Sequence, residues 1–487
     1  MRLKRLPLPL LARVSVLIIA AGLAADGAVF AADAAGQEIS PGKLIERIVC
    51  QADATQSYAL YLPSGYDPSQ ARPILILFDA GARGPMAVEA FREAAETFGW
   101  IVAGSNDSHN GPVEENDRAC RAVCADLQKR FLLDPRRVYV VGFSGGSRVA
   151  SRFPRVMGRP VAGVIACGAG LSSDVRPESL KAGSYFGLAG LADFNYREMK
   201  ALDAAFDPLG LAHRFLFFEG SHDWPASSLC LRAVGWLEVA AMKAGLREKD
   251  EALIAGVLRL ELEAAQSLEA AGRVFRAVEG LEAVRSLFDG IRDVPGLAAR
   301  IEGLRAREEF ARFLAAEKKR DKRNEGFRAG FGRAFGSVEG NEPGGRAAVG
   351  SVLMEMNIGH LKREARNAKD VEDRGLASRL LFEFSFAAQT RGADLSNQGD
   401  FAKAGAYYDL AMAACEEGLM REKYLYFGGA CIASLAGEKK RALDLLESAV
   451  AKGFSDVEAL EASKALDPIR TDDRFRQIME KARAARR

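Results

Sequence analysis

Two patterns of apolar positions divide the chain. Between residues 37 and 245, short apolar runs alternate with helical stretches. Several runs, such as 74–78 and 138–143, are apolar at nearly every position, which is typical of strands covered on both faces. From residue 246 onward strand signals stop, and the chain is rich in Ala, Leu, Glu and Arg with helical periodicity. The pattern predicts an α/β half followed by an all-helical half.

Apolar runs bounded by turn residues predict seven strands in the first half. They lie at 58–62, 74–78, 100–104, 138–143, 161–167, 185–189 and 214–218. Helical stretches, including 87–97 and 117–132, separate many of them. Alternating strands and helices favour a doubly wound, mostly parallel sheet.

The length and charge of the chain limit its architecture and its partners. With 487 residues it is too long for one ordinary core, so we expect two or three domains. We predict an α/β domain over 37–245, a helical region over 246–340 and, after a Gly-rich break, helical repeats over 346–487. The net charge of +2 and the apolar share of 48% indicate a soluble globular composition. They give no electrostatic reason to expect binding of nucleic acid or of a charged membrane.

The first 34 residues read as a targeting segment. Residues 1–5 form a short basic stretch, 14–25 are apolar, and two candidate cleavage sites with small residues follow at 29–31 and 32–34. This is the pattern of a secretory signal peptide, and it predicts export to the periplasm or the exterior. A membrane anchor is the alternative, but the apolar core is shorter than the roughly 20 residues of a spanning helix. No later stretch is long and apolar enough to span a bilayer, so no span is expected after cleavage.

Seven cysteines raise the question of disulfides or metal binding. Cys120 and Cys124 lie one helical turn apart, but no second pair and no nearby histidine supports a metal or redox site. Buried thiols, or one structural bridge with Cys50 as a candidate member, are the preferred interpretation. The sequence has no metal-binding cluster and no phosphate-binding glycine loop, so no cofactor is predicted.

Two segments near the C-terminus share a spacing of small residues. Gly399 is followed by Ala404, Tyr408 and Ala411, and Gly392 lies seven residues before it. The same spacing recurs 38 residues later, at 430, 437, 442, 446 and 449, and a degenerate copy lies at 272, 277 and 281. Small residues let two antiparallel helices approach closely, and the spacing resembles the tetratricopeptide repeat, whose usual period is about 34 residues. A generic array of helical hairpins is the alternative.

The motif Gly142-Phe143-Ser144-Gly145-Gly146 carries the strongest chemical signal. It follows a predicted strand and precedes a helical pattern, which is the context that a nucleophile elbow requires. Such a turn projects the serine hydroxyl above the sheet, and the glycines avoid clashes in it. The alternative is a Gly-rich turn without chemistry. We predict Ser144 as a nucleophile.

A serine hydroxyl needs a base, and the chain offers four histidines. In hydrolases of this type the order along the chain is Ser, acid, His. His109 precedes the serine and His360 lies in the helical half. His213 stands before the last predicted strand, at the wrong end of a parallel sheet, and is expected to be a surface histidine. His222 follows the carboxyl end of that strand, where sites in such sheets form, and is the predicted base.

The acid should follow the preceding strand. The strand at 185–189 leads to Asp193, which therefore reaches the same edge of the sheet as His222. Asp203 and Asp207 lie farther along the next helix, and the side chain of Asp223 should diverge from its neighbour His222. Asp193 is the predicted acid, and an N-cap of the following helix is its alternative role.

Two backbone N–H groups should bind the developing oxyanion. Gly145, the residue after the nucleophile, should supply one. The loop after the strand at 74–78 should supply the other, from Gly81 or Ala82, and the sequence does not decide between them. A simple loop is the alternative.

Residues 55–240 resemble the α/β-hydrolase superfamily. They are similar to secreted carboxylesterases related to polyhydroxybutyrate depolymerases and feruloyl esterases, on the strength of GFSGG at 142–146, LADFNY at 191–196 and SHDWP at 221–225. The resemblance implies an acyl-enzyme mechanism on an ester, and the lack of an evident long cap inserted between the strands favours a small one. The family often has His-Gly in the oxyanion loop, whereas this chain has Asp79-Ala80. Arg83 and the loop 105–112 are candidates for the pocket wall, with surface charge and a plain turn as alternatives.

Three functions compete. The first is an exported carboxylesterase whose helical repeats bind a protein partner or act as a scaffold. The second is a non-catalytic binding protein on a hydrolase fold, and the third is a serine peptidase. If the halves are independent, removal of 346–487 should leave esterase activity and abolish binding of the partner.

Overall fold

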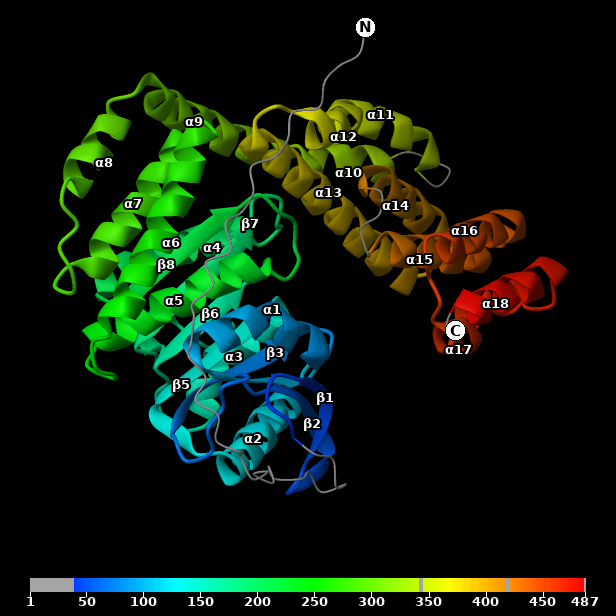
Figure 1. Ribbon diagram of the computed structural model, residues 1–487. Helices are drawn as coiled ribbons and strands as arrows, with labels where there is room; N and C mark the ends of the chain where they lie inside the picture. Colours follow the sequence, from blue (N-terminus) through cyan, green and yellow to red (C-terminus); the bar gives the residue numbers. More distant parts are fainter. Residues whose placement is uncertain (1–38, 341–344, 417–420, 486–487) are drawn as a thin grey trace, which may run out of the picture. The chain divides into compact units, whose positions relative to one another are not determined.

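An eight-stranded sheet organises the first half of the chain, in a computed structural model that describes residues 39–340, 345–416 and 421–485 (Figure 1). The strand order is β1-β2-β4-β3-β5-β6-β7-β8. The neighbours from β4 to β8 run parallel, while β2 runs antiparallel to both β1 and β4. The strands are β1 (Leu44–Cys50), β2 (Asp53–Tyr61), β3 (Arg72–Asp79), β4 (Ile101–Ser105), β5 (Leu133–Phe143), β6 (Gly163–Cys167), β7 (Ser184–Gly190) and β8 (Ala212–Phe218).

The predicted mostly parallel α/β sheet, followed by an all-helical region, is confirmed. Each of the seven predicted strands overlaps one of β2 to β8. Strand β1 was not predicted, because it lies at the sheet edge with exposed residues in its middle and two register shifts against β2. These features remove the strict alternation that marks a half-buried strand.

Helices cover both faces of the sheet. Leu75, Leu77 and Val141 point to one face and share a hydrophobic core with residues of α1 and α5. Phe78 points to the other face, where its ring lies 6.0 Å from that of Phe153 in α3. The helices of this half are α1 (Gly84–Phe98), α2 (Val113–Arg130), α3 (Gly145–Val156), α4 (Tyr196–Phe206) and α5 (Ser227–Lys243).

The helical half continues directly from α5. Its helices are α6 (Glu251–Ala270), α7 (Val274–Phe288), α8 (Leu297–Arg305), α9 (Glu308–Ala329), α10 (Phe331–Glu339), α11 (Val349–Glu355), α12 (Ile358–Asn367), α13 (Val371–Asn397), α14 (Phe401–Ala414), α15 (Glu422–Leu435), α16 (Lys439–Ala451), α17 (Val457–Ala462) and α18 (Asp473–Ala485). Ile254, Leu281 and Ile301 of α6 to α8 belong to the same core as α1 and α5. The hydrophobic core therefore runs across the predicted boundary at 245/246, and the domain limits stay a prediction.

The small residues of the C-terminal segments lie where helices meet. Gly399 and Gly437 have φ of +83° and +78° and form the turns between α13 and α14 and between α15 and α16. A Cβ at Gly392 would come within 2.9 Å of the Tyr408 ring, so α13 and α14 approach closely there. The predicted helical hairpins are present, and their assignment to the tetratricopeptide family stays a prediction.

The remaining sequence predictions concern the N-terminus and the cysteines. Residues 1–34, predicted as a signal peptide, lie outside the described residues. Within the described ranges, the helices are all too short or too polar to cross a bilayer. The seven cysteines are all described; they are free thiols, and six of them are buried. This agrees with buried thiols, and Cys50 does not form the bridge that was the other possibility.

A buried charge cluster joins α6 to the sheet. Glu261 of α6 is 1% exposed and accepts hydrogen bonds from Arg214 of β8 at 2.7 Å and from Arg232 of α5 at 3.0 and 2.7 Å. Burial alone would raise the pKa of Glu261, but the charges and hydrogen bonds of both arginines lower it to about 2. The carboxylate thus binds protons less tightly in the folded protein than in the unfolded chain.

Replacing Glu261 by glutamine should lower the free energy of unfolding by about 3–5 kcal/mol, because the buried Arg214 and the partly buried Arg232 lose their carboxylate. The carboxylate of the wild type should stabilise the fold above pH 4.5, and this contribution should disappear as the pH falls from 4.5 towards 2. Urea unfolding of both proteins between pH 3 and 7 measures both effects. Glu263→Gln, an exposed neighbour on the same helix, is the matched control, and equal losses in the two variants would contradict the account.

Candidate active site

Ser144 occupies a strained turn between β5 and α3. Its backbone has φ 55° and ψ −122°, a conformation that a residue with a Cβ rarely adopts. A Cβ at Gly142 would lie 2.0 Å from the Gly146 carbonyl oxygen, and a Cβ at Gly146 would lie 2.0 Å from the Phe78 carbonyl oxygen. The glycines are therefore required by the close approach of the turn to its own helix and to β3. The turn has the geometry of a nucleophile elbow.

The three residues predicted as a triad lie together. His222 Nε2 is 2.9 Å from Ser144 Oγ, and His222 Nδ1 is 2.9 Å from Asp193 Oδ2. Asp193 is 1% exposed, and its Oδ1 accepts the Asn195 N–H at 2.8 Å. An ionised carboxylate only accepts hydrogen bonds, so Nδ1 carries the proton and Nε2 is free to accept the Ser144 hydroxyl proton. The arrangement can activate a serine oxygen.

The other candidates lie elsewhere. His213 is the second residue of β8, at the end of the parallel strands opposite to the triad, with Nε2 3.6 Å from Asp203 Oδ1 and 3.4 Å from Asp207 Oδ1. Its side chain is 14% exposed, so His213 is partly buried, and it lies apart from the triad, as expected of a histidine without a catalytic role. Asp223 is exposed, and its carboxylate accepts the N–H of Trp224 instead of contacting His222.

Asp79 organises the loop that was expected to bind the oxyanion. Its carboxylate is fully buried and accepts hydrogen bonds from Arg83 at 2.9 Å, from the Gly81 N–H at 2.7 Å and from Trp224 Nε1 at 2.7 Å. Burial would raise the pKa of Asp79, but these bonds hold it below its usual value. The Ala82 N–H donates to the Asp79 carbonyl oxygen at 3.3 Å. Both predicted second donors, Gly81 and Ala82, thus already have acceptors within the loop, and their role stays a prediction.

Aromatic rings hold the catalytic candidate His222 in place. The ring centroid of His222 lies 4.8 Å from that of Phe143 and 4.1 Å from that of Phe194. Phe194 stacks in turn on Phe382 of α13, with centroids 4.1 Å apart and an interplanar angle of 8°. Arg421 lies over Phe382 at 4.6 Å. The helical half therefore contributes to the packing behind His222.

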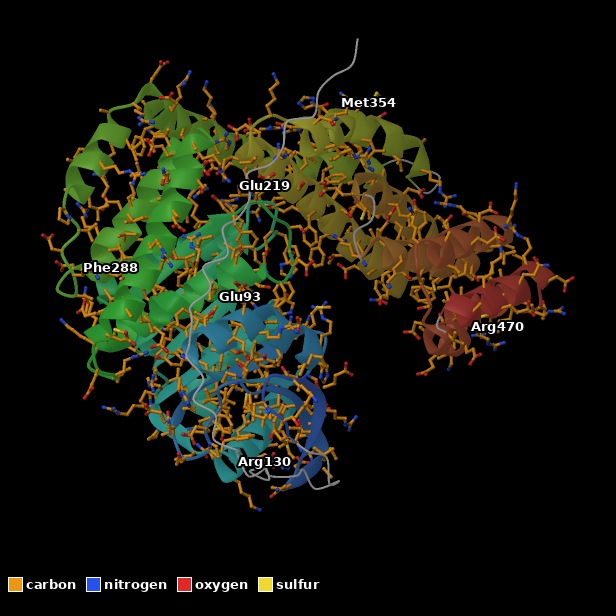
Figure 2. The ribbon with its side chains drawn as sticks, viewed as in Figure 1. Glu93, Arg130, Glu219, Phe288, Met354 and Arg470 are labelled. Carbon is orange, nitrogen blue, oxygen red and sulfur yellow. The ribbon has the colours of Figure 1, made fainter. Side chains whose placement is uncertain are left out.

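The loop that carries Asp193 also rests on α13. Arg379 donates a hydrogen bond to the Leu191 carbonyl oxygen, and a Cβ at Gly375 would lie 2.5 Å from the same oxygen. Arg374 pairs with Glu219, which follows β8 and is labelled in Figure 2. Sequence reasoning missed these contacts. The small residue Gly375 inside a long helical pattern was their one signal, because such a glycine can mark a close approach.

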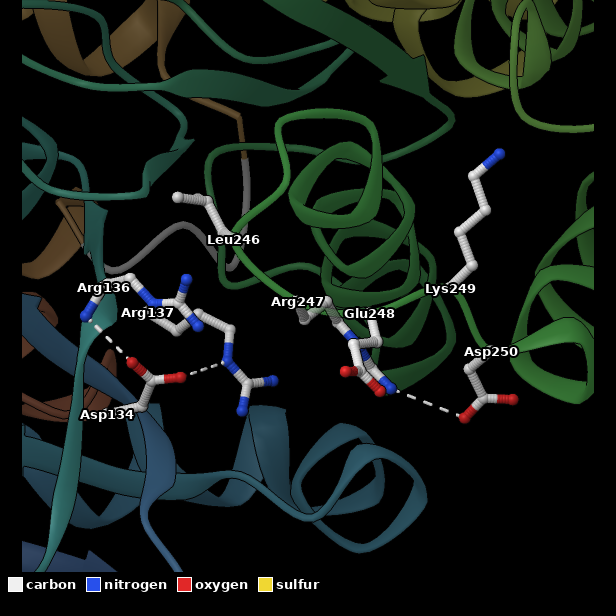
Figure 3. Close-up of a pocket in the computed structure, with 8 residues that line it drawn as sticks. All are labelled: Asp134, Arg136, Arg137, Leu246, Arg247, Glu248, Lys249 and Asp250. Carbon is white, nitrogen blue, oxygen red and sulfur yellow. Dashed lines mark hydrogen bonds and ion pairs between the residues drawn. The ribbon is translucent and has the colours of Figure 1, made fainter.

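One hollow of the described surface lies away from the triad. It measures about 670 Å³ and is lined by charged residues at the start of β5 and in the loop between α5 and α6 (Figure 3). Ser144 follows the opposite end of β5. Asp134 pairs with Arg137, and Arg247 with Asp250, so these charges largely satisfy one another. Among the described residues, no group of three His, Cys, Asp or Glu side chains could hold a metal ion.

Among the comparisons with known proteins, only the comparison with solved structures finds similar proteins. No family model matches the chain, and no curated protein matches it. It is similar to an S-formylglutathione hydrolase of Staphylococcus aureus, at 15% identity over 37% of this chain and 92% of that chain, with a TM-score of 0.32. It is also similar to a ferulic acid esterase, at 13% identity over 41% and 98%, with a TM-score of 0.34. Esterase 2 of Thermogutta terrifontis gives 15% identity over 44% and 98%, with a TM-score of 0.32. These activities are stated for those proteins; the chemistry of this chain rests on its own geometry.

Proposed function

We propose that this chain is a serine carboxylesterase that forms an acyl-enzyme on Ser144. The observation that carries the proposal is the row of hydrogen bonds from Ser144 through His222 to the buried Asp193, at 2.9 Å each, on a strained turn. Burial of Asp193 and the contacts of His222 with the rings of Phe143 and Phe194 fix the orientation of the imidazole. A preorganised base of this kind activates a serine hydroxyl.

The reaction would proceed in two halves. Ser144 Oγ attacks the ester carbonyl carbon while its proton passes to His222 Nε2, and the Gly145 N–H helps to bind the oxyanion. The C–O bond of the ester then breaks, and the proton on Nε2 passes to the departing alcohol. Water next attacks the acyl-enzyme, gives its proton to Nε2 and releases the acid, and Ser144 recovers its proton. Asp193 keeps Nδ1 protonated throughout and stabilises the imidazolium.

A hydrolysis assay separates this proposal from its alternatives. The purified chain should hydrolyse p-nitrophenyl acetate and butyrate with saturation kinetics and should leave a matched peptide p-nitroanilide almost intact. Faster cleavage of the anilide would favour a serine peptidase. A well-folded chain that cleaves neither substrate would favour a non-catalytic binding protein. Export and a protein partner for the helical repeats remain predictions from the sequence.

A further inference from the structure

Backbone contacts connect the loop 106–112 to residues 79–83 at the end of β3, the loop that was expected to bind the oxyanion and is here called the oxyanion loop. The Asn110 N–H donates to the Ala80 carbonyl oxygen at 2.8 Å, and Gly81 and His109 form a β-bridge. The loop is itself held from behind by Asn116 of α2, which is 6% exposed. Its Oδ1 accepts from the Ser108 hydroxyl at 3.0 Å and from the His109 N–H at 3.1 Å. The backbone of Asn110 therefore has a fixed position.

The side chain of Asn110 lies against Gly145. A Cβ built on Gly145 would come within 1.9 Å of Asn110 Oδ1 and 3.4 Å of the Ala80 Cβ. The space beside Gly145, whose N–H is the expected first oxyanion donor, is thus bordered by Ala80 and by the carboxamide of Asn110. That carboxamide is exposed and forms no hydrogen bond with any described residue. A half-turn about the Cβ–Cγ bond exchanges its oxygen and nitrogen, so the NH₂ group can face the same space.

The two backbone N–H groups that were expected to donate to the oxyanion, those of Gly81 and Ala82, already have other acceptors. The Gly81 N–H is bound to the buried Asp79 carboxylate, and the Ala82 N–H is bound to the Asp79 carbonyl oxygen. Breaking the first of these bonds would leave part of a buried carboxylate without a donor, which is costly. The side-chain NH₂ group of Asn110 has no acceptor among the described residues, so it can donate to the oxyanion without breaking a hydrogen bond.

We infer that Asn110 is a catalytic residue whose side-chain NH₂ donates to the oxyanion, together with the Gly145 N–H. The inference rests on the proposed acyl-enzyme mechanism. When the carbonyl carbon becomes tetrahedral, negative charge collects on its oxygen, and Asn110 Nδ2 donates a hydrogen bond to that oxygen. No atom is transferred, and the bond weakens again when the carbonyl re-forms. Such a donor favours the transition state over the bound ester.

The test compares three variants with the wild type on p-nitrophenyl acetate. Asn110→Ala should lower kcat by about 10²–10³-fold with little change in KM, as removal of an oxyanion donor does. Asn110→Asp has the same shape but places a negative charge beside the oxyanion, so it should lose at least as much activity. Glu114→Gln, an exposed residue in the first turn of α2, is the control and should keep the wild-type kcat.

A second readout excludes a merely structural effect. An alkylboronic acid forms a tetrahedral adduct with a nucleophilic serine, and its Ki should rise in the Asn110 variants by the same factor as kcat/KM falls. If Asn110→Ala does not fold, the isosteric Asp variant decides. An Asp or Ala variant that keeps kcat within about twofold of the wild type would overturn the inference and leave the proposed esterase intact. A folded wild type without esterase activity would overturn the proposed function, and the inference with it.

Discussion

Replacing His222 by alanine should lower kcat for a p-nitrophenyl ester by about 10⁵–10⁶-fold, the loss typical of a removed base in a serine triad. His222 Nε2 is the acceptor 2.9 Å from Ser144 Oγ, so without it the hydroxyl keeps its proton and remains a weak nucleophile. KM should change much less, because the imidazole acts on the serine proton rather than on the resting ester. Steady-state kinetics with a circular dichroism spectrum of the variant measure both points.

His213→Ala is the matched control for this prediction. It removes the same type of side chain at the N-terminal end of β8, away from the triad, where His213 lies close to Asp203 and Asp207. Its kcat should stay within about twofold of the wild type, because no atom of that cluster reaches Ser144. Similar losses in the two variants would show that the effect on kcat arises from the fold and not from a base at His222.

Removing residues 371–487 should lower kcat by at least about 10²-fold, since small displacements of catalytic groups have costs of that size. Helix α13 supplies the Arg379 hydrogen bond to Leu191, two residues before Asp193, and the Phe382 ring behind Phe194 and His222. Glu372 of the same helix pairs with the buried Arg276 of α7 at 3.0 Å. These contacts favour the opposite of the expectation from the sequence, that the hydrolase half works alone, and the truncation decides between the two.

Two further variants keep this prediction decisive if the shortened chain does not fold. Phe382→Ala removes the ring that stacks on Phe194, and should lower kcat by up to about 10²-fold with the fold intact. Phe386→Ala removes the next ring of the stack, which is 55% exposed, and should have little effect. A second truncation that removes only 452–487 leaves α13 in place and should keep most activity. Full activity after loss of 371–487 would show that the halves are independent.

The sheet and the triad could be predicted because each produces a pattern within a short stretch of sequence. Strands such as β3 are apolar at nearly every position, and only a strand covered on both faces requires that. The order of Ser144, Asp193 and His222, each just past the end of a predicted strand, placed all three at one edge of the sheet. The sequence alone thus yielded the site that the structure brings together.

The contacts around the triad come from segments that are far apart in the sequence and pack together in the fold. Local sequence patterns do not predict such packing. Phe382 lies 160 residues beyond His222, and its helical spacing shows only that it belongs to a helix. The sequence pattern likewise does not show that His213 is partly buried and lies close to the carboxylates of Asp203 and Asp207. The sequence shows that Asp79 lies in the oxyanion loop, but it does not predict that the Asp79 carboxylate accepts a hydrogen bond from the Gly81 N–H. These features follow from tertiary packing.

Labelling with a fluorophosphonate probe tests the central claim most directly. The probe reacts covalently with an activated serine, and peptide mass spectrometry identifies the modified residue. The account predicts one adduct per wild-type chain, located on Ser144, and no adduct in a folded Ser144→Ala variant. Labelling that persists unchanged in Ser144→Ala, or a folded wild-type chain that does not react, would contradict the assignment of Ser144 as the nucleophile.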